Sequence, residues 1–123
     1  MPYSIVRNDI TKMRVDAIVN PTDWMYSGGG GTDEKVHLAA GKALDRECEA
    51  LPPLRDGMAV VTGAYKLPCR YIIHTVGPVW EGGNHHERET LIACYRNALY
   101  AAADRNCERY GCICGVDALR EVP

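Results

Sequence analysis

The stretch from Asp16 to Asp33, DAIVNPTDWMYSGGGGTD, decides the fold that this sequence predicts. Its first five residues form a short apolar run that stops at a Pro-Thr-Asp turn, which is typical of a buried strand. Four consecutive glycines follow at 28–31, and Thr32 and Asp33 are both good residues for the N-terminal cap of a helix. The stretch therefore predicts a strand, a glycine-rich loop and a helix in close succession.

Outside this stretch, helical and strand patterns alternate. Apolar residues recur at helical spacing after Asp33 until two prolines end the pattern, and two β-branched runs follow it. The predicted strands cover 3–9, 16–20, 58–64 and 70–76, the predicted helices cover 34–51 and 87–104, and 112–116 is an ambiguous segment that could form a strand. This alternation predicts an α/β fold with a mixed or parallel sheet. Ligands bind such sheets outside the carboxyl ends of the strands, which directs attention to the glycine-rich loop.

Length and composition limit the classes of function. The chain has 123 residues, enough for one domain over 1–123, with 46% hydrophobic residues and a net charge of −2. A slightly acidic chain makes a nucleic acid partner unlikely, and no apolar stretch is long enough to span a membrane. No signal peptide is visible, so we expect a cytoplasmic protein with reduced thiols. The spacing of its six cysteines does not match a zinc site, and we expect no metal.

The four glycines have two interpretations. Their N–H groups can approach a phosphate closely beside a helix N-terminus, or the segment can be a flexible surface linker. The strand before it and the helix after it favour the phosphate or nucleotide site. The loop is not a Walker motif, because no Gly-Lys-Ser/Thr closes it, and the spaced glycines of the dinucleotide fingerprint fit poorly.

Several motifs occur together in the order found in macrodomains. They are Asn8-Asp-Ile-Thr11, Val15-Asp-Ala-Ile-Val-Asn20, Gly28-Gly-Gly-Gly-Thr-Asp33, Val36-His-Leu-Ala-Ala-Gly41, Tyr71-Ile-Ile-His-Thr-Val-Gly-Pro78 and Cys94-Tyr95. The chain resembles this family from about Ile5 to Asp104, and it is most similar to the MacroD-type ADP-ribosyl hydrolases. The resemblance implies a three-layer α/β/α fold with a mixed sheet and a function in binding ADP-ribose, with no cofactor or metal.

The resemblance also implies a role for individual residues. Asp9 would accept a hydrogen bond from the adenine amino group beside the Ile10 backbone, and Asn20 and Asp23 would hold the distal ribose. The diphosphate would lie against Gly28, Gly29, Gly30, Gly31 and Thr32. Asp33 would orient or activate water, so the implied catalytic residues are Asp33, Asn20 and Asp23. The sequence alone would favour a helix cap for Asp33. His37 is expected to be packed or on the surface rather than catalytic, and His74, Trp80 and Tyr95 to be structural or packing residues.

The sequence departs from the family pattern at two places. Asn20-Pro-Thr-Asp23 replaces the usual Asn-Ala-Ala-Asn, so a carboxylate that only accepts hydrogen bonds replaces an amide. Its charge should weaken diphosphate binding, although Asp23 could instead be a second acid/base group. The other departure is in 106–123, which lacks the family's second phosphate loop of Ser-Thr-Gly-x-Tyr-Gly type. We therefore expect a C-terminally incomplete macrodomain without the last strands and helix, with weaker ligand binding and self-association through exposed sheet edges.

Three functions remain open at this stage. The leading one is hydrolysis of ADP-ribose esters, either O-acetyl-ADP-ribose or ADP-ribosylated protein carboxylates. The second is an ADP-ribose reader without turnover, which the Asp23 substitution and the altered tail favour and the presence of Asp33 opposes. The third is an inactive, truncated product. The predicted partner in the first two is ADP-ribose or an ADP-ribosylated protein.

Overall fold

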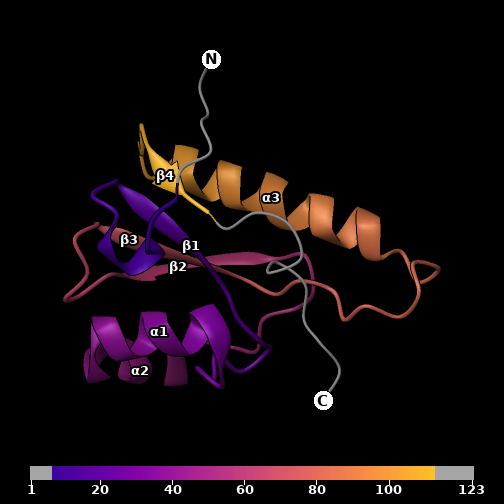
Figure 1. Ribbon diagram of the computed structural model, residues 1–123, viewed down its shortest axis with the longest axis horizontal. Coiled ribbons are helices and arrows are strands. Elements are labelled where there is room, and N and C mark those ends of the chain that lie inside the picture. Colours follow the sequence, from indigo (N-terminus) through magenta and orange to yellow (C-terminus); the bar gives the residue numbers. More distant parts are fainter. Residues whose placement is uncertain (1–6, 113–123) are drawn as a thin grey trace.

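The computed structural model describes residues 7–112, which form a four-stranded sheet with helices on both faces (Figure 1). In chain order the elements are η1 (Ile10–Lys12), β1 (Ala17–Pro21), α1 (Gly31–Ala40), α2 (Lys42–Glu49), β2 (Ala59–Gly63), β3 (Tyr71–Thr75), α3 (Glu87–Asp104) and β4 (Tyr110–Gly111). The strands β1, β2 and β3 and the helix α3 follow the alternation that the sequence predicts.

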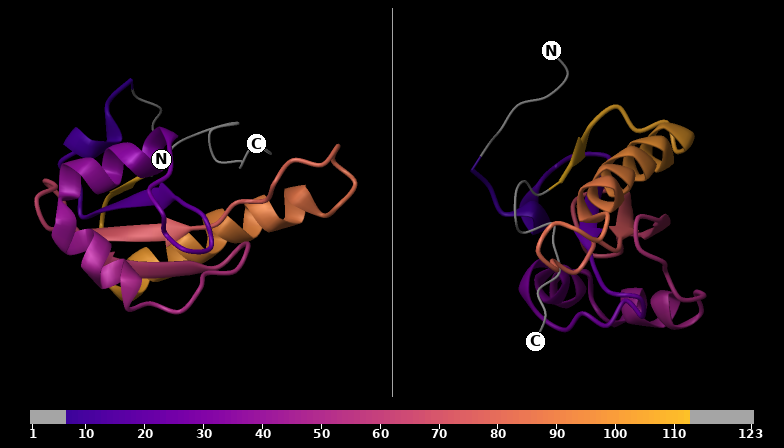
Figure 2. Two further views of the ribbon diagram at one scale, coloured as in Figure 1. Left: turned by 90° about the horizontal axis from the view of Figure 1, so that it is seen from below. Right: turned by 90° about the vertical axis from the view of Figure 1, so that its right-hand side faces the viewer.

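The sheet is mixed, with the strand order β2-β3-β1-β4. Strand β1 runs parallel to β3, with Pro21 opposite Thr75, and parallel to β4. Strand β2 runs antiparallel to β3. Helices α1 and α2 cover one face and α3 covers the other, as the two views of Figure 2 show. The three-layer α/β/α architecture with a mixed sheet, which the resemblance implies, is therefore confirmed.

Alternate side chains of β1 and β3 enter two separate cores. Ile18 and Ile72 pack with the buried faces of α1 and α2, and Val19 and Ile73 pack with α3. This alternation follows from the two-residue period of a strand. It also places Asn20 and His74, two residues beyond Ile18 and Ile72, on the α1 side of the sheet.

The helix predicted over 34–51 is two helices. Gly41 separates α1 from α2 with a φ of 94°, which a side chain would disfavour, and its N–H caps α1 on the His37 carbonyl. The apolar spacing continues through this break, so periodicity alone does not reveal it. Helix α1 also begins earlier than predicted: its N-cap is Gly30, and neither Thr32 nor Asp33 is the cap.

The two ends of the described chain also differ from the sequence prediction. Residues 7–9 are not a strand, and a 3₁₀ turn follows them whose N-cap is Asp9; residues 3–6 of the predicted strand lie outside the described part. Strand β4 is short and pairs only with Ala17 and Ile18. The predicted segment over 112–116 lies outside the described residues except for Cys112. Among residues 7–112 no helix is long and apolar enough to cross a bilayer.

Candidate functional site

The glycine-rich loop joins the carboxyl end of β1 to the N-terminus of α1. The end of β1 is fixed beside β3, because Thr22 N donates to Thr75 O at 2.8 Å. The end of a parallel strand pair therefore lies next to the start of a helix, the arrangement in which α/β proteins bind ligands. Sequence reasoning predicted a site here, and the structure brings together Asn20, Gly28 and Asp33.

Asp33 is the centre of this site and is 7% exposed. Its Oδ1 accepts a hydrogen bond from Asn20 Nδ2 at 2.9 Å. Its Oδ2 accepts two, from Thr22 Oγ1 at 2.7 Å and from Gly28 N at 3.0 Å. One carboxylate thus connects the end of β1, the glycine loop and the first turn of α1.

These contacts keep Asp33 ionised. Burial disfavours its charged form, but the close contact with His37 and the hydrogen bonds from Asn20 and Thr22 outweigh burial and lower the pKa of Asp33 below its usual 3.8. The N-terminus of α1 favours a negative charge at this position as well. A buried carboxylate that stays charged at neutral pH can orient a water molecule or accept a proton.

His37 lies between two carboxylates, one turn further along α1. Its Nδ1 is 2.6 Å from Asp45 Oδ1, and its Nε2 is 3.3 Å from Asp33 Oδ1 in a contact that is not aligned as a hydrogen bond. The Asp33 carboxylate, with help from Asp45, raises the pKa of His37 above its usual 6.5. His37 is buried, which agrees with the packed position that was one of the two alternatives predicted from the sequence. It is also part of the electrostatic environment of the site.

The glycine loop has a backbone that other residues would strain. Gly28, Gly30 and Gly31 have φ values of 67°, 147° and 57°, and a Cβ on Gly28 would lie 3.1 Å from the His37 ring. The Gly28 N–H donates to Asp33. The next four amides, those of Gly29 to Thr32, have no acceptor among residues 7–112. No side chain caps α1. These donors at a helix N-terminus suit an anion such as a phosphate.

Asp23 is not part of the Asp33 cluster. Its Oδ1 accepts hydrogen bonds from Met25 N and Ser27 N, both at 3.0 Å, and Ser27 Oγ donates to its Oδ2. Burial disfavours its charge, but these hydrogen bonds outweigh burial and lower its pKa. Asp23 therefore holds the start of the loop, and its negative charge lies near Asp33.

Asp9 is the N-cap of η1 and Ile10 is its first residue, and η1 contacts α1. The Asp9 Oδ1 accepts from Thr11 N at 2.9 Å and from Thr11 Oγ1 at 2.7 Å, and Ile10 packs against the core beneath α1 and α2. Asp9 is exposed, and its Oδ2 has no partner among the described residues. It is therefore free to accept a hydrogen bond from a ligand.

Some functional residues were missed or misplaced by sequence reasoning. Thr22 lies within the quoted Asn-Pro-Thr-Asp turn, but only the fold shows that its hydroxyl donates to Asp33. Trp80 and Tyr95, predicted as packing residues, are 55% and 38% exposed. The Trp80 ring lies beside Gly83, and Tyr95 lines a small cavity between the sheet and α3.

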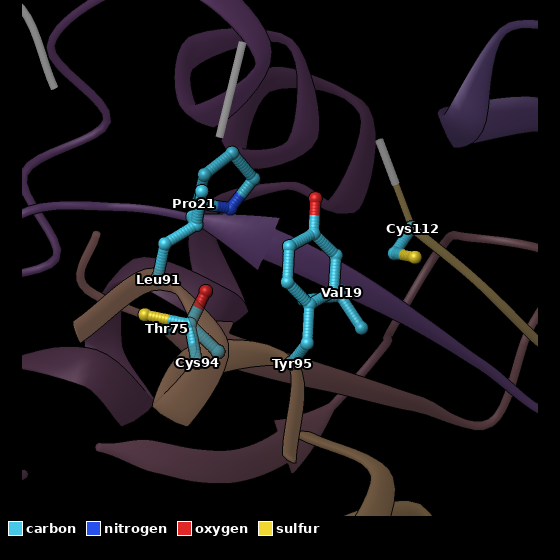
Figure 3. A pocket seen from close by; sticks show the side chains of 7 residues that line it. All are labelled: Val19, Pro21, Thr75, Leu91, Cys94, Tyr95 and Cys112. Atoms are coloured by element: carbon cyan, nitrogen blue, oxygen red, sulfur yellow. The ribbon is translucent and has the colours of Figure 1, made fainter. Parts of the chain in front are cut away.

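A small cavity of about 20 Å³ lies on the other side of the sheet (Figure 3). Side chains of β1, β3 and α3 and Cys112 line it: Val19, Pro21, Thr75, Leu91, Cys94, Tyr95 and Cys112. Its volume suits about one water molecule and is far too small for a nucleotide. It is separate from the glycine loop. Among residues 7–112, no group of three His, Cys, Asp or Glu side chains is placed to hold a metal ion.

Comparison with known proteins places this geometry in a family. A macro domain-containing protein of Mesorhizobium japonicum is 52% identical over 80% of this chain and 56% of its own length. The O-acetyl-ADP-ribose deacetylase of Salmonella typhimurium is 46% identical over 80% of this chain and 57% of its own. The solved Oceanobacillus iheyensis macrodomain with ADP has a TM-score of 0.81 and 36% identity, covering 85% of this chain and 59% of that chain.

A second solved structure, the Trypanosoma brucei macrodomain in complex with ADP, has a TM-score of 0.79 and 34% identity, covering 89% of this chain and 45% of that chain. The chain thus spans little more than half the length of the curated relatives that it matches. The family model for the Macro domain matches residues 19–114, which include the end of β1, the glycine loop and α1 to α3. The chain belongs to the macro domain family.

Proposed function

We propose that this chain binds ADP-ribose at the glycine loop and hydrolyses ADP-ribose esters, with O-acetyl-ADP-ribose or an ADP-ribosylated protein carboxylate as substrate. The observation that carries the proposal is the ionised, buried Asp33 beside a run of backbone amides without acceptors. The Salmonella relative named O-acetyl-ADP-ribose deacetylase and the Oceanobacillus structure with ADP support it.

Binding would use the amides at the start of α1. The N–H groups of Gly29 to Thr32 donate to the diphosphate, and the dipole of α1 adds a favourable interaction of about 1 kcal/mol. Asp9 Oδ2 accepts from the adenine amino group. The ribose hydroxyls donate to the carboxylate of Asp23, whose Oδ2 retains a lone pair beyond the one that accepts from Ser27 Oγ.

Hydrolysis would use Asp33. Its Oδ1 has one aligned hydrogen bond, from Asn20, and therefore a free direction in which it can accept from a water molecule. The water oxygen bonds to the acyl carbon, the bond between that carbon and the ribose oxygen breaks, and the water proton passes through Asp33 to the departing oxygen. The products are a carboxylic acid and ADP-ribose.

A second candidate function is an ADP-ribose reader without turnover. The observation in its favour is that both Asp33 oxygens already accept hydrogen bonds within the fold. In that case Asp33 shapes the loop, and the loop only binds. An inactive product is the third possibility that the same experiment addresses.

The experiment is titration calorimetry with ADP-ribose and with AMP as a control, followed by an assay of O-acetyl-ADP-ribose hydrolysis. We expect ADP-ribose to bind selectively over AMP, and Asp33→Asn to lose turnover roughly a hundredfold while it still binds. Asp104→Asn, a change at the exposed end of α3, is the matched control and should keep both properties. Binding without turnover supports the reader, and no binding refutes both functions.

A further inference from the structure

A series of hydrogen bonds runs along the α1 side of the sheet, from Thr62 on β2 to Asp33. His74 on β3, which is completely buried, lies at its middle. Its Nδ1 is 3.2 Å from Asn20 Nδ2 on β1, and its Nε2 is 2.9 Å from Thr62 Oγ1 on β2. Asn20 Nδ2 also reaches Asp33 Oδ1, so three strands and α1 share one chain of polar atoms.

The direction of each hydrogen bond in this chain is fixed. A carboxylate only accepts, so the Asn20 atom beside Asp33 is the NH₂ group, and this group also donates to His74 Nδ1. His74 therefore carries its proton on Nε2 and donates it to Thr62 Oγ1. The Thr62 hydroxyl in turn donates to Gly63 O at 3.1 Å. Each hydrogen bond between Gly63 and Asp33 therefore has a single direction.

The imidazole is held neutral. Burial and the nearby His37 lower the pKa of His74 to about 4. The Tyr26 ring packs edge-on against it, with centroids 5.6 Å apart and an angle of 88°. At neutral pH the His74 ring therefore acts through its tautomer and not through a charge.

The Asn20 amide depends on this tautomer for its orientation. Asn20 Oδ1 is buried and has no hydrogen-bond partner among residues 7–112. No contact of Oδ1 within residues 7–112 therefore determines which way the amide is turned. Its orientation is determined by the two acceptors of Nδ2, which are His74 Nδ1 and Asp33 Oδ1.

We propose that His74 and Thr62 are positioning residues for Asp33, because the Nε2–H tautomer of His74, stabilised by the Thr62 hydroxyl, turns the Asn20 amide so that it donates to the carboxylate. We call this series of hydrogen bonds, from Thr62 through His74 and Asn20 to Asp33, the relay. Its effect on turnover rests on the proposed hydrolysis, whereas its effects on the His74 tautomer and on the pKa of Asp33 do not.

Removal of the Thr62 hydroxyl tests the relay. In Thr62→Val the His74 Nε2–H loses its acceptor in a buried place, which favours the movement of the proton to Nδ1. Nδ1–H then requires an acceptor, so the Asn20 amide turns over and directs Oδ1 towards Asp33. An amide oxygen beside a carboxylate disfavours its charged form, and the pKa of Asp33 rises.

The titratable groups that surround Asp33 must be separated from this effect. They are His37 on the same helix, Asp45 and Cys48 on α2, Asp23 on the loop and His74 on β3. None of them is replaced in Thr62→Val, and within residues 7–112 the Thr62 hydroxyl bonds only to His74 and Gly63. A shift at Asp33 in this variant therefore passes through His74 and Asn20.

The first measurement is nitrogen-15 NMR of the His74 ring in the full, wild-type chain at neutral pH. We expect a neutral ring with the proton on Nε2. A ring protonated on Nδ1, or a charged one, overturns the proposal, whether or not the chain proves to be an enzyme and whether or not any variant folds.

The second measurement compares Thr62→Val with Thr62→Ser, which keeps the hydroxyl, and with Thr75→Val on the opposite face of the sheet. We expect only Thr62→Val to change the His74 tautomer and to raise the pKa of Asp33 in carbon-13 titration. Where the wild type hydrolyses O-acetyl-ADP-ribose, kcat should fall roughly ten- to a hundredfold with KM nearly unchanged, and the acidic limb of the pH profile should move upward. An unchanged tautomer and Asp33 pKa in a folded Thr62→Val overturns the relay, and absent wild-type turnover with the expected NMR shifts refutes only the hydrolysis.

Discussion

Two glycine-containing loops of this protein precede a helix, and in each a carboxylate in the first turn of that helix holds the loop. Before α1, Asp33 accepts from one loop amide, Gly28 N. Before α3, the buried Glu87 accepts from three, those of Glu81, Gly83 and His85, at 2.9, 2.7 and 2.6 Å. The backbone amides of the second loop thus donate within the protein, to Glu87. Most amides of the first loop have no acceptor within the described chain, which is why we assign a ligand to the first loop and only a structural role to the second.

The largest expected effect comes from removal of the two carboxylates in turn. Asp33→Ala leaves Asn20, Thr22 and Gly28 without their buried acceptor and should cost about 3 kcal/mol of unfolding free energy. Glu87→Ala should also lower the Tm, but ADP-ribose binding should persist because the glycine loop is unaffected. Urea unfolding and calorimetry of both variants provide the measurements. Loss of ADP-ribose binding in Glu87→Ala would erase the distinction between the loops.

A matched pair of glycines tests the same distinction at the backbone. Gly28 and Gly83 both have positive φ values, 67° and 90°, and a Cβ on either would lie 3.1 Å from an aromatic carbon, of His37 or Trp80. Each substitution by alanine should cost about 1–2 kcal/mol of stability. Only Gly28→Ala should weaken ADP-ribose binding in calorimetry. Equal weakening by Gly83→Ala would indicate a general loss of structure.

The pH dependence of stability should also separate the two helix starts. Hydrogen bonds from the Glu81, Gly83 and His85 amides lower the pKa of Glu87 to about 2, from 4.5. The contribution of Glu87 is therefore fully present above pH 4.5 and is lost as the pH falls towards 2. The difference in Tm between wild type and Glu87→Gln should shrink over this range. A constant difference would mean that the charge of Glu87 does not hold its loop.

At the first loop His37 should stabilise the protein with the opposite pH dependence, because Asp33 raises its pKa. Its stabilising charge is fully present below pH 6.5 and is lost as the pH rises through the higher folded pKa. His37→Gln should therefore lower the Tm more at pH 6 than at pH 9. The opposite trend in thermal unfolding would show that the ring is neutral between Asp33 and Asp45.

The smallest effect is expected for Asp23→Asn. Asn retains an oxygen for Met25 N and Ser27 N, so the loop should keep its shape, while one negative charge near the diphosphate disappears. ADP-ribose affinity should rise roughly threefold, as for a weak exposed charge interaction. Asp45→Asn is unsuitable as a control because Asp45 contacts His37, so Asp104→Asn at the exposed end of α3 serves instead. Weaker binding by Asp23→Asn would show that the hydrogen bonds from the ribose hydroxyls to the carboxylate outweigh the repulsion between its charge and the diphosphate.

The sequence predicted the elements better than the roles of individual atoms. The helix over 87–104 and the strands near 17–21, 59–63 and 71–75 were predicted because apolar periodicity reports burial on one face. The break at Gly41 was not, since it depends on a single φ value. Asn20, Gly28 and Asp33 were predicted through linked motifs. The proximity of Thr62 and Asn20 to His74 requires the register Asn20↔His74 and Val60↔His74, which no local pattern encodes.

The sheet order has a consequence for how the chain folds. Strand β1 is paired with β3 and β4, so Asp16 contacts Arg70, 54 residues away, and Arg109, 93 residues away. Strands β2 and β3 are neighbours along the chain, and Thr62 pairs with Ile72 across a short connection. Contacts between distant residues are slow to form because a long loop must close first. We expect the β2–β3 hairpin to form early and β1 to join it late, so the ligand loop that β1 carries should be among the last parts to acquire protection from hydrogen exchange during refolding.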